Sequence, residues 1–396
     1  MDRLTLADVR PWGGDPADLV LAAGVIEAVL PAGDAPEGGD RIEGGGLLAL
    51  PGFVNAHAHV DKSWWGQPWV SYGGEATTQG RIAHERAERD KYGIPNPDST
   101  VAVLREFLRH GTTRVRTHVD VDLGVGLRGI EVVQQAVAAL GHAIEVEIVA
   151  FPQDGVLRRP GVLELLDRAA AEGAVHHIGG LDPGAIDRDP AGQLDALFDI
   201  ATRHDVGIDI HLHDSGTLGV FEYELLIERV RESGLAGRVT VSHGFALGGV
   251  PASRQPALLD GLREAGISWA TVAPVGSTPL PWRQLRDRGI AVGLGTDGIR
   301  DLWSPYGDGD ILRVAQNFAR LHGLRTDEEI AGAVELATRR GGSFVGGRTH
   351  DLVVGARADV VLLDAENIQD ALLRTPRREL VVAGGRVVAR AGEVLV

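Results

Sequence analysis

Four short runs place polar, metal-capable side chains at the ends of strand-like apolar stretches. They are His57-Ala58-His59, His211-Leu212-His213-Asp214, Ser242-His243 and Thr296-Asp297. Imidazole and carboxylate groups are ligands that proteins commonly offer to divalent transition metals. A bound divalent ion lowers the pKa of a coordinated water from about 15.7 to roughly 7. Together the four runs therefore indicate a centre that activates water.

The pair His57 and His59 is the strongest part of this pattern. Two residues apart on a strand, their side chains share one face. An isolated pair of this kind is more often a pair of core histidines. Here, however, buried His and Asp side chains recur at several strand ends, and without partners their desolvation costs several kcal/mol. We therefore predict four metal ligands, which leave room for one water: His57, His59, His211 and Asp297.

Asp297 and His243 have predicted catalytic roles close to the metal. Asp297 can also lie beside the water and take its proton. His243 follows an apolar run and is expected to face the same cavity, where it would stabilise the attacking water or the charge that develops on the substrate. We expect three more histidines to be interior or supporting residues of the fold: His118, His176 and His177.

The elements that position these residues alternate in type from Gly52 onward. Apolar strand-like runs alternate with helix-like stretches such as Val101–Arg109 and Gln193–Arg203. This alternation is typical of parallel βα units, and eight units favour a closed barrel with its active site at the carboxyl ends of the strands. An open doubly wound sheet is the competing fold, but no Gly-rich phosphate loop follows the first run. The eight runs begin near Phe53, Thr113, Ile144, Val175, Ile208, Val239, Ile267 and Ile290.

The two ends of the sequence share a pattern that differs from the alternating strands and helices of the middle. Short strand-like pieces separated by Gly-rich turns precede residue 51, with 33–46 expected to be turn material, and strand-like pieces return from about Asp351. We therefore predict an α/β protein with two units. Residues 1–51 and 346–396 form a small β-sandwich, and 52–345 form a (β/α)8 catalytic barrel.

Composition narrows the class of protein. Of 396 residues, 44% are hydrophobic and 24% charged, as in ordinary folded domains. The 39 basic and 55 acidic residues leave a net charge of -16, which argues against a nucleic-acid partner. There is no cysteine, so thiolate metal sites are excluded. No apolar run is long enough to span a membrane and no secretory leader is visible, so we expect a cytoplasmic protein.

The chain resembles the amidohydrolase superfamily along its whole length. The resemblance rests on the stretch from Pro51 to His59, the eight-unit rhythm and the closing run from Val354 to Asp359. It implies a distorted (β/α)8 barrel with a composite β-sandwich, and homo-oligomers as in relatives. Members with two metals usually carry a lysine on the fourth strand. The corresponding run, from Val175 to Asp182, has none, which favours one divalent metal per chain, Zn or Fe.

Within the superfamily the chain is similar to the cytosine deaminase branch. The runs from Arg116 to Val121, from Ile148 to Gln153 and from Asp301 to Gly307 carry this likeness. It implies that Gln153 binds the amide-like edge of a heterocycle, since its amide both donates and accepts. In that branch a glutamate shuttles protons from the fourth position of the His-x-x-Glu motif. Here that position is Asp214, which is one methylene shorter.

The region also resembles N-isopropylammelide aminohydrolase at Lys62, Asp182, His213 and His243. The likeness implies that Lys62 is a cation near the site. Three of the seven tryptophans fall within residues 64–69, just beyond the metal ligands. Aromatic rings stack on planar heterocycles and shield them from water, so we predict that Trp64 and Trp65, with Trp303, form walls of the substrate site.

These observations predict a mononuclear metal-dependent aminohydrolase that replaces an exocyclic amino or alkylamino group on a small nitrogen heterocycle by oxygen. Asp214, His213 or Lys62 would deliver the proton to the ring or to the leaving amine, and Gln153 and Asp182 would contact the substrate. The alternatives are a cytosine or isocytosine deaminase, a hydrolase that opens a cyclic amide, and a scaffold protein without activity. A deaminase built on Cys ligands is excluded, because the sequence has no cysteine. The absence of a Gly-x-Ser-x-Gly motif argues against a Ser-His-Asp hydrolase.

Overall fold

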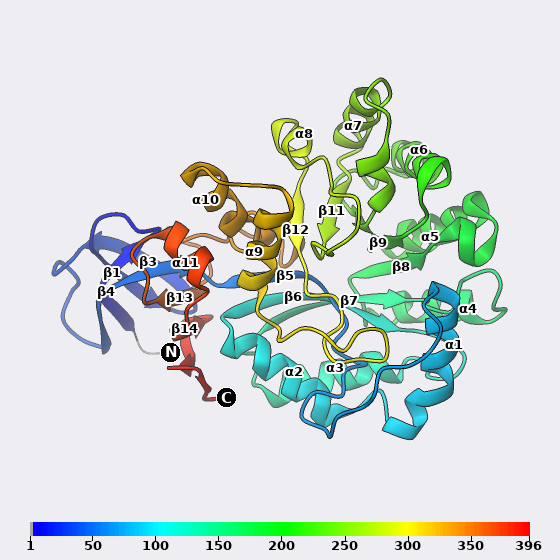
Figure 1. The fold of residues 1–396 in the computed structure, drawn as a ribbon. Helices are drawn as coiled ribbons and strands as arrows, with labels where there is room; N and C mark the ends of the chain where they lie inside the picture. The colour runs from blue at the N-terminus through cyan, green and yellow to red at the C-terminus, as the bar shows by residue number, and fades with distance from the viewer. Residues whose placement is uncertain (1–2) are drawn as a thin grey trace.

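A barrel of eight parallel strands forms the centre of the structure, a computed structural model that describes residues 3–396 (Figure 1). The sheet order follows the chain from β5 to β12, and the barrel closes where the Asp297 backbone N–H donates to the carbonyl of His57 at 3.0 Å. The predicted barrel is thus confirmed, with each predicted run forming one strand. The strands are β5 (Phe53–Ala58), β6 (Thr112–Asp120), β7 (Glu145–Phe151), β8 (His177–Leu181), β9 (Gly207–Leu212), β10 (Val239–His243), β11 (Ser268–Thr271) and β12 (Val292–Leu294).

Helices cover the outside of this barrel (Figure 1). In α2, for example, the Asn96 side chain caps the first turn and Pro97 opens the helix, while Val103, Leu104 and Phe107 are buried on one face. Helix α1 (Thr78–Glu88) borders the pocket described below. The outer helices are α2 (Pro97–Arg109), α3 (Arg128–Ala139), α4 (Val162–Ala171), α5 (Pro190–His204), α6 (Gly216–Ser233), α7 (Gln255–Glu264), α8 (Trp282–Asp287), α9 (Ile311–Leu321) and α10 (Asp327–Leu336). Short helical turns are η1 (Arg89–Tyr92), η2 (Pro183–Asp187), η3 (Phe245–Gly249) and η4 (Gly341–Phe344).

Strands from both ends of the chain form one separate sheet beside the barrel (Figure 1). The strand order of this sheet is β16-β15-β14-β13-β4-β1-β2-β3. One apolar core contains side chains from both ends of the chain. The shared terminal unit predicted from the sequence is therefore present, although its exact boundaries stay a prediction. Its elements are β1 (Leu4–Pro11), β2 (Ala17–Ala22), β3 (Val25–Pro31), β4 (Asp40–Pro51), β13 (Val360–Leu363), α11 (Ile368–Arg374), β14 (Arg378–Ala383), β15 (Arg386–Arg390) and β16 (Glu393–Val394).

The expectation that residues 33–46 are turn material is wrong for its second half. Strand β4 begins at Asp40 and pairs in parallel with β1. Its glycines belong to the strand, because a Cβ on Gly44 would lie 2.4 Å from Cγ1 of Val9 at the shift in register between the two strands. Glycine inside a strand here marks a close approach rather than a turn.

Within residues 3–396, no helix combines the length and the apolar character that crossing a bilayer requires.

Candidate metal centre and substrate pocket

The four predicted ligands converge at the carboxyl ends of β5, β9 and β12. Nε2 of His59 lies 3.3 Å from Nε2 of His211 and 3.3 Å from Oδ1 of Asp297, and Nε2 of His57 lies 3.5 Å from the same oxygen. Ligand atoms about 2.1 Å from a tetrahedral metal are about 3.4 Å apart. The converging imidazole nitrogens and carboxylate oxygen form a donor set that a divalent cation fits.

The protonation of these side chains also suits metal ligation. Burial lowers the pKa of His59 to about 4, and burial lowers the pKa of His211 well below its usual value. Burial raises the pKa of Asp297, but hydrogen bonds with His57 and His59 outweigh it and hold this pKa well below the usual range. Neutral imidazoles and an ionised carboxylate are the forms that bind a metal.

Three site residues have a left-handed backbone that non-glycine residues rarely adopt. The φ angles are 67° at His243, 61° at Asp297 and 35° at Asp182. Glycine follows the first two, and a Cβ on Gly244 would lie 2.1 Å from the Trp269 ring. Each of the three lies at or just beyond the end of a barrel strand. Such strain typically persists where the surroundings enforce it, as at functional sites.

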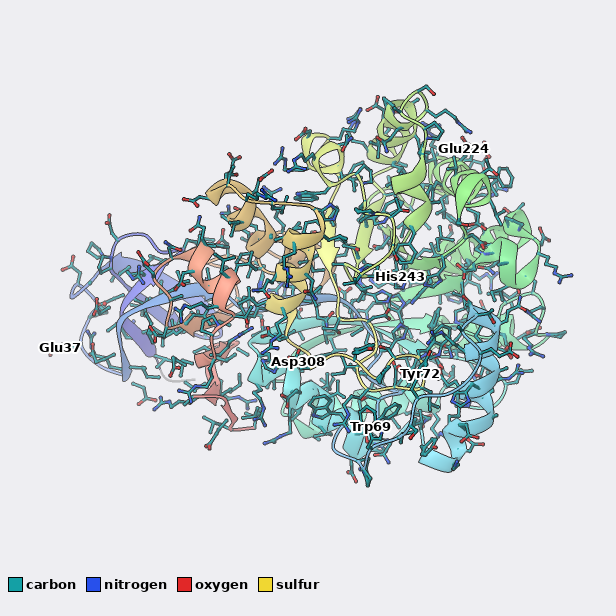
Figure 2. All side chains as sticks on the ribbon, viewed as in Figure 1. Glu37, Trp69, Tyr72, Glu224, His243 and Asp308 are labelled. Carbon is teal, nitrogen blue, oxygen red and sulfur yellow. The ribbon has the colours of Figure 1, made fainter. Side chains whose placement is uncertain are left out.

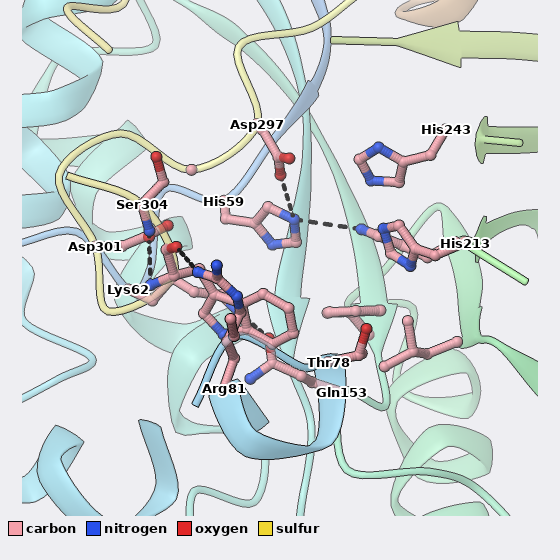
Figure 3. Close-up of a pocket in the computed structure, with 16 residues that line it drawn as sticks. His59, Lys62, Thr78, Arg81, Gln153, His213, His243, Asp297, Asp301 and Ser304 are labelled. Carbon is pink, nitrogen blue, oxygen red and sulfur yellow. Dashed lines mark hydrogen bonds and ion pairs between the residues drawn. The ribbon is translucent and has the colours of Figure 1, made fainter. Parts of the chain in front are cut away.

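A pocket of about 350 Å³ opens beside the ligands (Figure 3). His213 and His243 lie on one side of it, and Lys62, Arg81 and Asp301 lie on the other. This volume is in the range of small-molecule sites. The side chain of Asp297 is 41% exposed and opens into this space.

His213 is held by Asp182, which itself does not line the pocket. The Nδ1–H of His213 donates to the Asp182 carboxylate at 3.1 Å, and its backbone N–H donates to the same carboxylate. Burial lowers the pKa of His213, but the hydrogen bond and the charge of Asp182 outweigh burial and raise it above its usual value. The pair therefore presents an oriented imidazole to the pocket, and Asp182 acts through His213.

Asp214 lies outside the pocket, although it neighbours His213 in the sequence. Its Oδ2 accepts from the backbone N–H of Ala185 at 3.1 Å, while Glu222 accepts from Gly184 at 3.0 Å. The two carboxyl groups thus hold the turn η2 that follows Asp182. The predicted role of Asp214 in proton delivery finds no support in this placement.

We predict that Glu222→Gln changes how stability depends on pH. Burial and the hydrogen bond with Asp214 raise the pKa of Glu222 to about 9, so the folded chain holds a proton that the unfolded chain releases near pH 4.5. This contribution is complete below pH 4.5 and is lost as the pH rises towards 9, by up to about 1.4 kcal/mol per pH unit. Gln donates and accepts at the same atoms but cannot ionise.

Denaturant unfolding at several pH values would check this prediction. Between pH 5 and 9 the variant is expected to lose less stability than the parent chain. Glu224→Gln on the same helix is the matched control, because the Glu224 side chain is half-exposed and pairs with Arg254 at 2.6 Å (Figure 2). Identical pH profiles for the parent and Glu222→Gln would contradict the shared proton.

Lys62 lies at the centre of a buried group of carboxylates. Its Nζ lies 2.8 Å from Oδ1 of Asp120 and 3.7 Å from Oε1 of Glu85, and it donates to Oε1 of Gln153 at 2.6 Å. Burial lowers the pKa of Lys62, but Asp120, Glu85 and Asp61 outweigh it and raise the pKa well above its usual value. Lys62 therefore keeps its proton, which weighs against its predicted role as proton donor.

Gln153 reaches the pocket with most of its hydrogen-bonding capacity already used. Its Nε2 donates to Glu85 at 2.9 Å and to Asp120 at 3.1 Å, and its Oε1 accepts from Lys62. An amide nitrogen has only two hydrogens. Towards a bound ring, Gln153 can therefore offer only the second lone pair of Oε1. This differs from the donor-and-acceptor contact that the resemblance implies.

The tryptophan-rich loop does not line the pocket. Trp64 is buried among other apolar side chains, Trp65 stacks on Arg300 at 5.2 Å, and Trp69 is 63% exposed at the edge of the molecule (Figure 2). Trp303 does line it, and its Nε1–H donates to Glu85. Of the three predicted walls, the structure places only Trp303 at the pocket.

Several residues at the site were not singled out from the sequence. Glu85 comes from α1, whose sequence carries no catalytic pattern. Asp120 and Asp301 lie in runs that resemble the cytosine deaminase branch, but the sequence predicted no role for them. Burial raises the pKa of Asp301 to about 7, and this carboxyl faces the pocket. His118, expected in the interior, lies with its ring 4.3 Å from that of His57, and both of its nitrogens lack a hydrogen-bond partner.

A closed parallel barrel with His and Asp side chains gathered at its strand ends is typical of barrel hydrolases. The model of the amidohydrolase family matches residues 97–389. N-isopropylammelide isopropyl amidohydrolase of Pseudomonas sp. strain ADP is 30% identical over 90% of this chain and 89% of its own length. The chain belongs to the amidohydrolase family, and it is a hydrolase that acts on non-peptide C–N bonds.

Solved structures agree with this assignment. The crystal structure of N-isopropylammelide isopropylaminohydrolase from Burkholderia multivorans superposes with a TM-score of 0.95 at 39% identity, and all of both chains is covered. 5-Methylcytosine deaminase from Klebsiella pneumoniae, liganded with phosphonocytosine, gives a TM-score of 0.80 at 26% identity, covering 100% of this chain and 99% of that one.

Proposed function

We propose that this protein is a mononuclear, Zn- or Fe-dependent aminohydrolase that removes an amino or alkylamino group from a small nitrogen heterocycle of the aminotriazine or aminopyrimidine type. The observation that carries the proposal is the convergence of the nitrogens of His57, His59 and His211 with Asp297 beside a pocket of about 350 Å³. Strand β8, where two-metal relatives carry a lysine, reads His-Ile-Gly-Gly-Leu and supports a single ion.

When bound, the divalent ion would supply a water acidic enough to serve as nucleophile at neutral pH. Asp297 holds a carboxylate open to the pocket and would accept the proton of that water. His243 lines the same pocket and would donate to the oxygen or nitrogen that gains charge on the substrate. His213, which Asp182 orients, would deliver a proton to the leaving amine.

The other side of the pocket would bind the ring. Phe151 and Trp303 provide aromatic faces, and Gln153 and Asp301 provide acceptors or a carboxyl hydrogen for the polar ring edge. The name of the relatives from Pseudomonas and Burkholderia, N-isopropylammelide isopropylaminohydrolase, supports an N-alkylamino heterocycle as the first substrate to test.

The test is a screen for released ammonia and amines over aminotriazines, aminopyrimidines and their N-alkyl derivatives, with the protein loaded with Zn or with Fe. Release of an alkylamine would support the proposal, and the rate ratio between metals would decide which ion is used. Release of ammonia from cytosine or isocytosine alone would favour the deaminase alternative. Ring opening without a released amine would overturn the proposal, and no turnover with either metal would favour the inactive scaffold.

We also propose a cytoplasmic location, self-association and small-molecule partners rather than nucleic acid. The net charge of -16 supports the last point. Size-exclusion chromatography with light scattering would measure the number of chains in the particle.

A further inference from the structure

A buried hydrogen-bond chain lies behind the metal ligand His57. Ser242, at the end of β10, places its Oγ 2.9 Å from Nδ1 of His57, the ring nitrogen that faces away from Asp297. The same hydroxyl donates to Oδ1 of Asp209 at 2.6 Å. Asp209 is on β9, and all three side chains are fully buried. The chain of contacts thus connects three strands of the barrel wall.

The direction of these bonds determines the tautomer of His57. A serine hydroxyl has one hydrogen, and the carboxylate of Asp209 can only accept it. The oxygen of Ser242 is then free only to accept, so Nδ1 of His57 must carry a hydrogen and donate it. The other nitrogen, Nε2, is left with its lone pair directed at Asp297. This buried Nε2 has no hydrogen-bond partner in the structure.

Asp209 is itself held by the guanidinium of Arg116. Nη1 of Arg116, on β6, donates to Oδ2 of Asp209 at 3.1 Å and to Oγ1 of Thr240 at 3.0 Å. The guanidinium also lies 3.1 Å from the carboxylate of Glu147. Arg116 thus occupies Oδ2 of Asp209, and Oδ1 accepts from Ser242.

We propose that Ser242 and Asp209 are positioning residues that hold His57 as the Nδ1–H tautomer with Nε2 ready to bind the metal. The inference rests on the proposed metal centre and adds to it a cause for the orientation of one ligand. Among the described residues, the other two imidazole ligands, His59 and His211, have an Nδ1 without any hydrogen-bond partner. His57 is therefore the ligand whose ring the protein itself orients before the metal binds.

Ser242→Ala tests the inference by removing one oxygen and leaving the pocket residues intact. Outer hydrogen-bond partners of metal ligands typically contribute 10- to 100-fold to metal affinity. We expect the variant to bind Zn²⁺ about 10- to 100-fold more weakly than the parent in competition with a chromophoric chelator. Ser242→Thr keeps the hydroxyl and is expected to restore the affinity.

Thr271→Val is the matched control. It also removes a buried hydroxyl at the end of a neighbouring barrel strand, but the Thr271 hydroxyl accepts from the backbone of Ala273 and does not contact His57. The control is expected to bind Zn²⁺ like the parent, while the metal-free forms of both variants melt at similar temperatures. A merely structural role of Ser242 would lower the melting temperature of the metal-free variant and leave Zn²⁺ affinity unchanged.

A second measurement needs no variant at Ser242. In the metal-free parent labelled with ¹⁵N-histidine, His57, assigned by its loss in His57→Gln, should show the Nδ1–H tautomer. The Nε2–H tautomer, or Zn²⁺ affinity of Ser242→Ala within about twofold of the parent where a tenfold loss is expected, overturns the inference. A parent chain that binds no divalent ion overturns the proposed function as well, so the two failures are distinguishable.

Discussion

His59→Ala is expected to abolish both metal binding and turnover. Nε2 of His59 is the donor closest to two others, at 3.3 Å from Asp297 and 3.3 Å from His211, so its loss opens the centre of the ligand set. A bound metal lowers the activation barrier by several kcal/mol, so its loss corresponds to a decrease in turnover of at least about 10³-fold. Elemental analysis and the amine-release assay would measure the two effects.

His204→Ala is the control, because His204 lies at the end of the outer helix α5 and pairs with Asp167 at 2.8 Å. It should retain about one metal per chain and full turnover, as expected for a single four-ligand site. Bound metal should also raise the melting temperature of the parent but not of His59→Ala, since a ligand of the folded state stabilises it. Full activity of the parent after chelation would show that the proposed chemistry is wrong.

Lys62→Met is expected to destabilise the fold rather than to change only the chemistry. The side chain is 3% exposed, and its ammonium neutralises the buried carboxylates of Asp120 and Glu85. Removing one partner of a buried charge cluster typically costs about 3–5 kcal/mol. Denaturant unfolding of the metal-loaded protein at pH 8 would measure the loss.

The cost should depend on pH in a defined direction. Burial already raises the pKa of Asp120 well above its usual value, whereas Lys62 and hydrogen bonds outweigh burial and hold the pKa of Glu85 below its usual value. Without the lysine both folded pKa values rise, so Glu85 must also take up a proton in the folded state. Stability from such groups is present at low pH and is lost as the pH rises. Lys62→Met should therefore be more destabilised at pH 8 than at pH 5.5. Lys91→Met, at an exposed pair with Glu88, is the control, and an equal cost at both pH values would contradict a buried charge cluster.

The proximity of the candidate ligands could be predicted from the sequence because each of them lies at or just beyond the end of a barrel strand. His57 and His59 share a face by the two-residue period, and the barrel brings all strand ends to one side, so position along a strand was enough to predict proximity. The eight βα units were predictable for the same reason, since apolar runs and helical stretches are local patterns. The turn assigned to 33–46 failed because Gly44 serves a long-range contact between strands.

The rest of the pocket depends on long-range contacts, which local sequence patterns do not predict. Adjacent residues such as His213 and Asp214 face different surroundings, one the pocket and one the carboxyl of Glu222. Glu85 reaches Gln153 from a helix 68 positions away, and the tryptophan-rich loop folds away from the pocket that its composition suggested.

The sequence by itself therefore determined the barrel, the candidate metal ligands and the class of reaction, because periodicity and strand ends are local properties of the chain. Only the tertiary structure decided which groups pair behind and beside those ligands. His57 is oriented through Ser242 and Asp209, and Lys62 is enclosed by Asp120 and Glu85, because hydrogen bonds and buried charges are satisfied by whichever side chains the fold brings within about 3 Å.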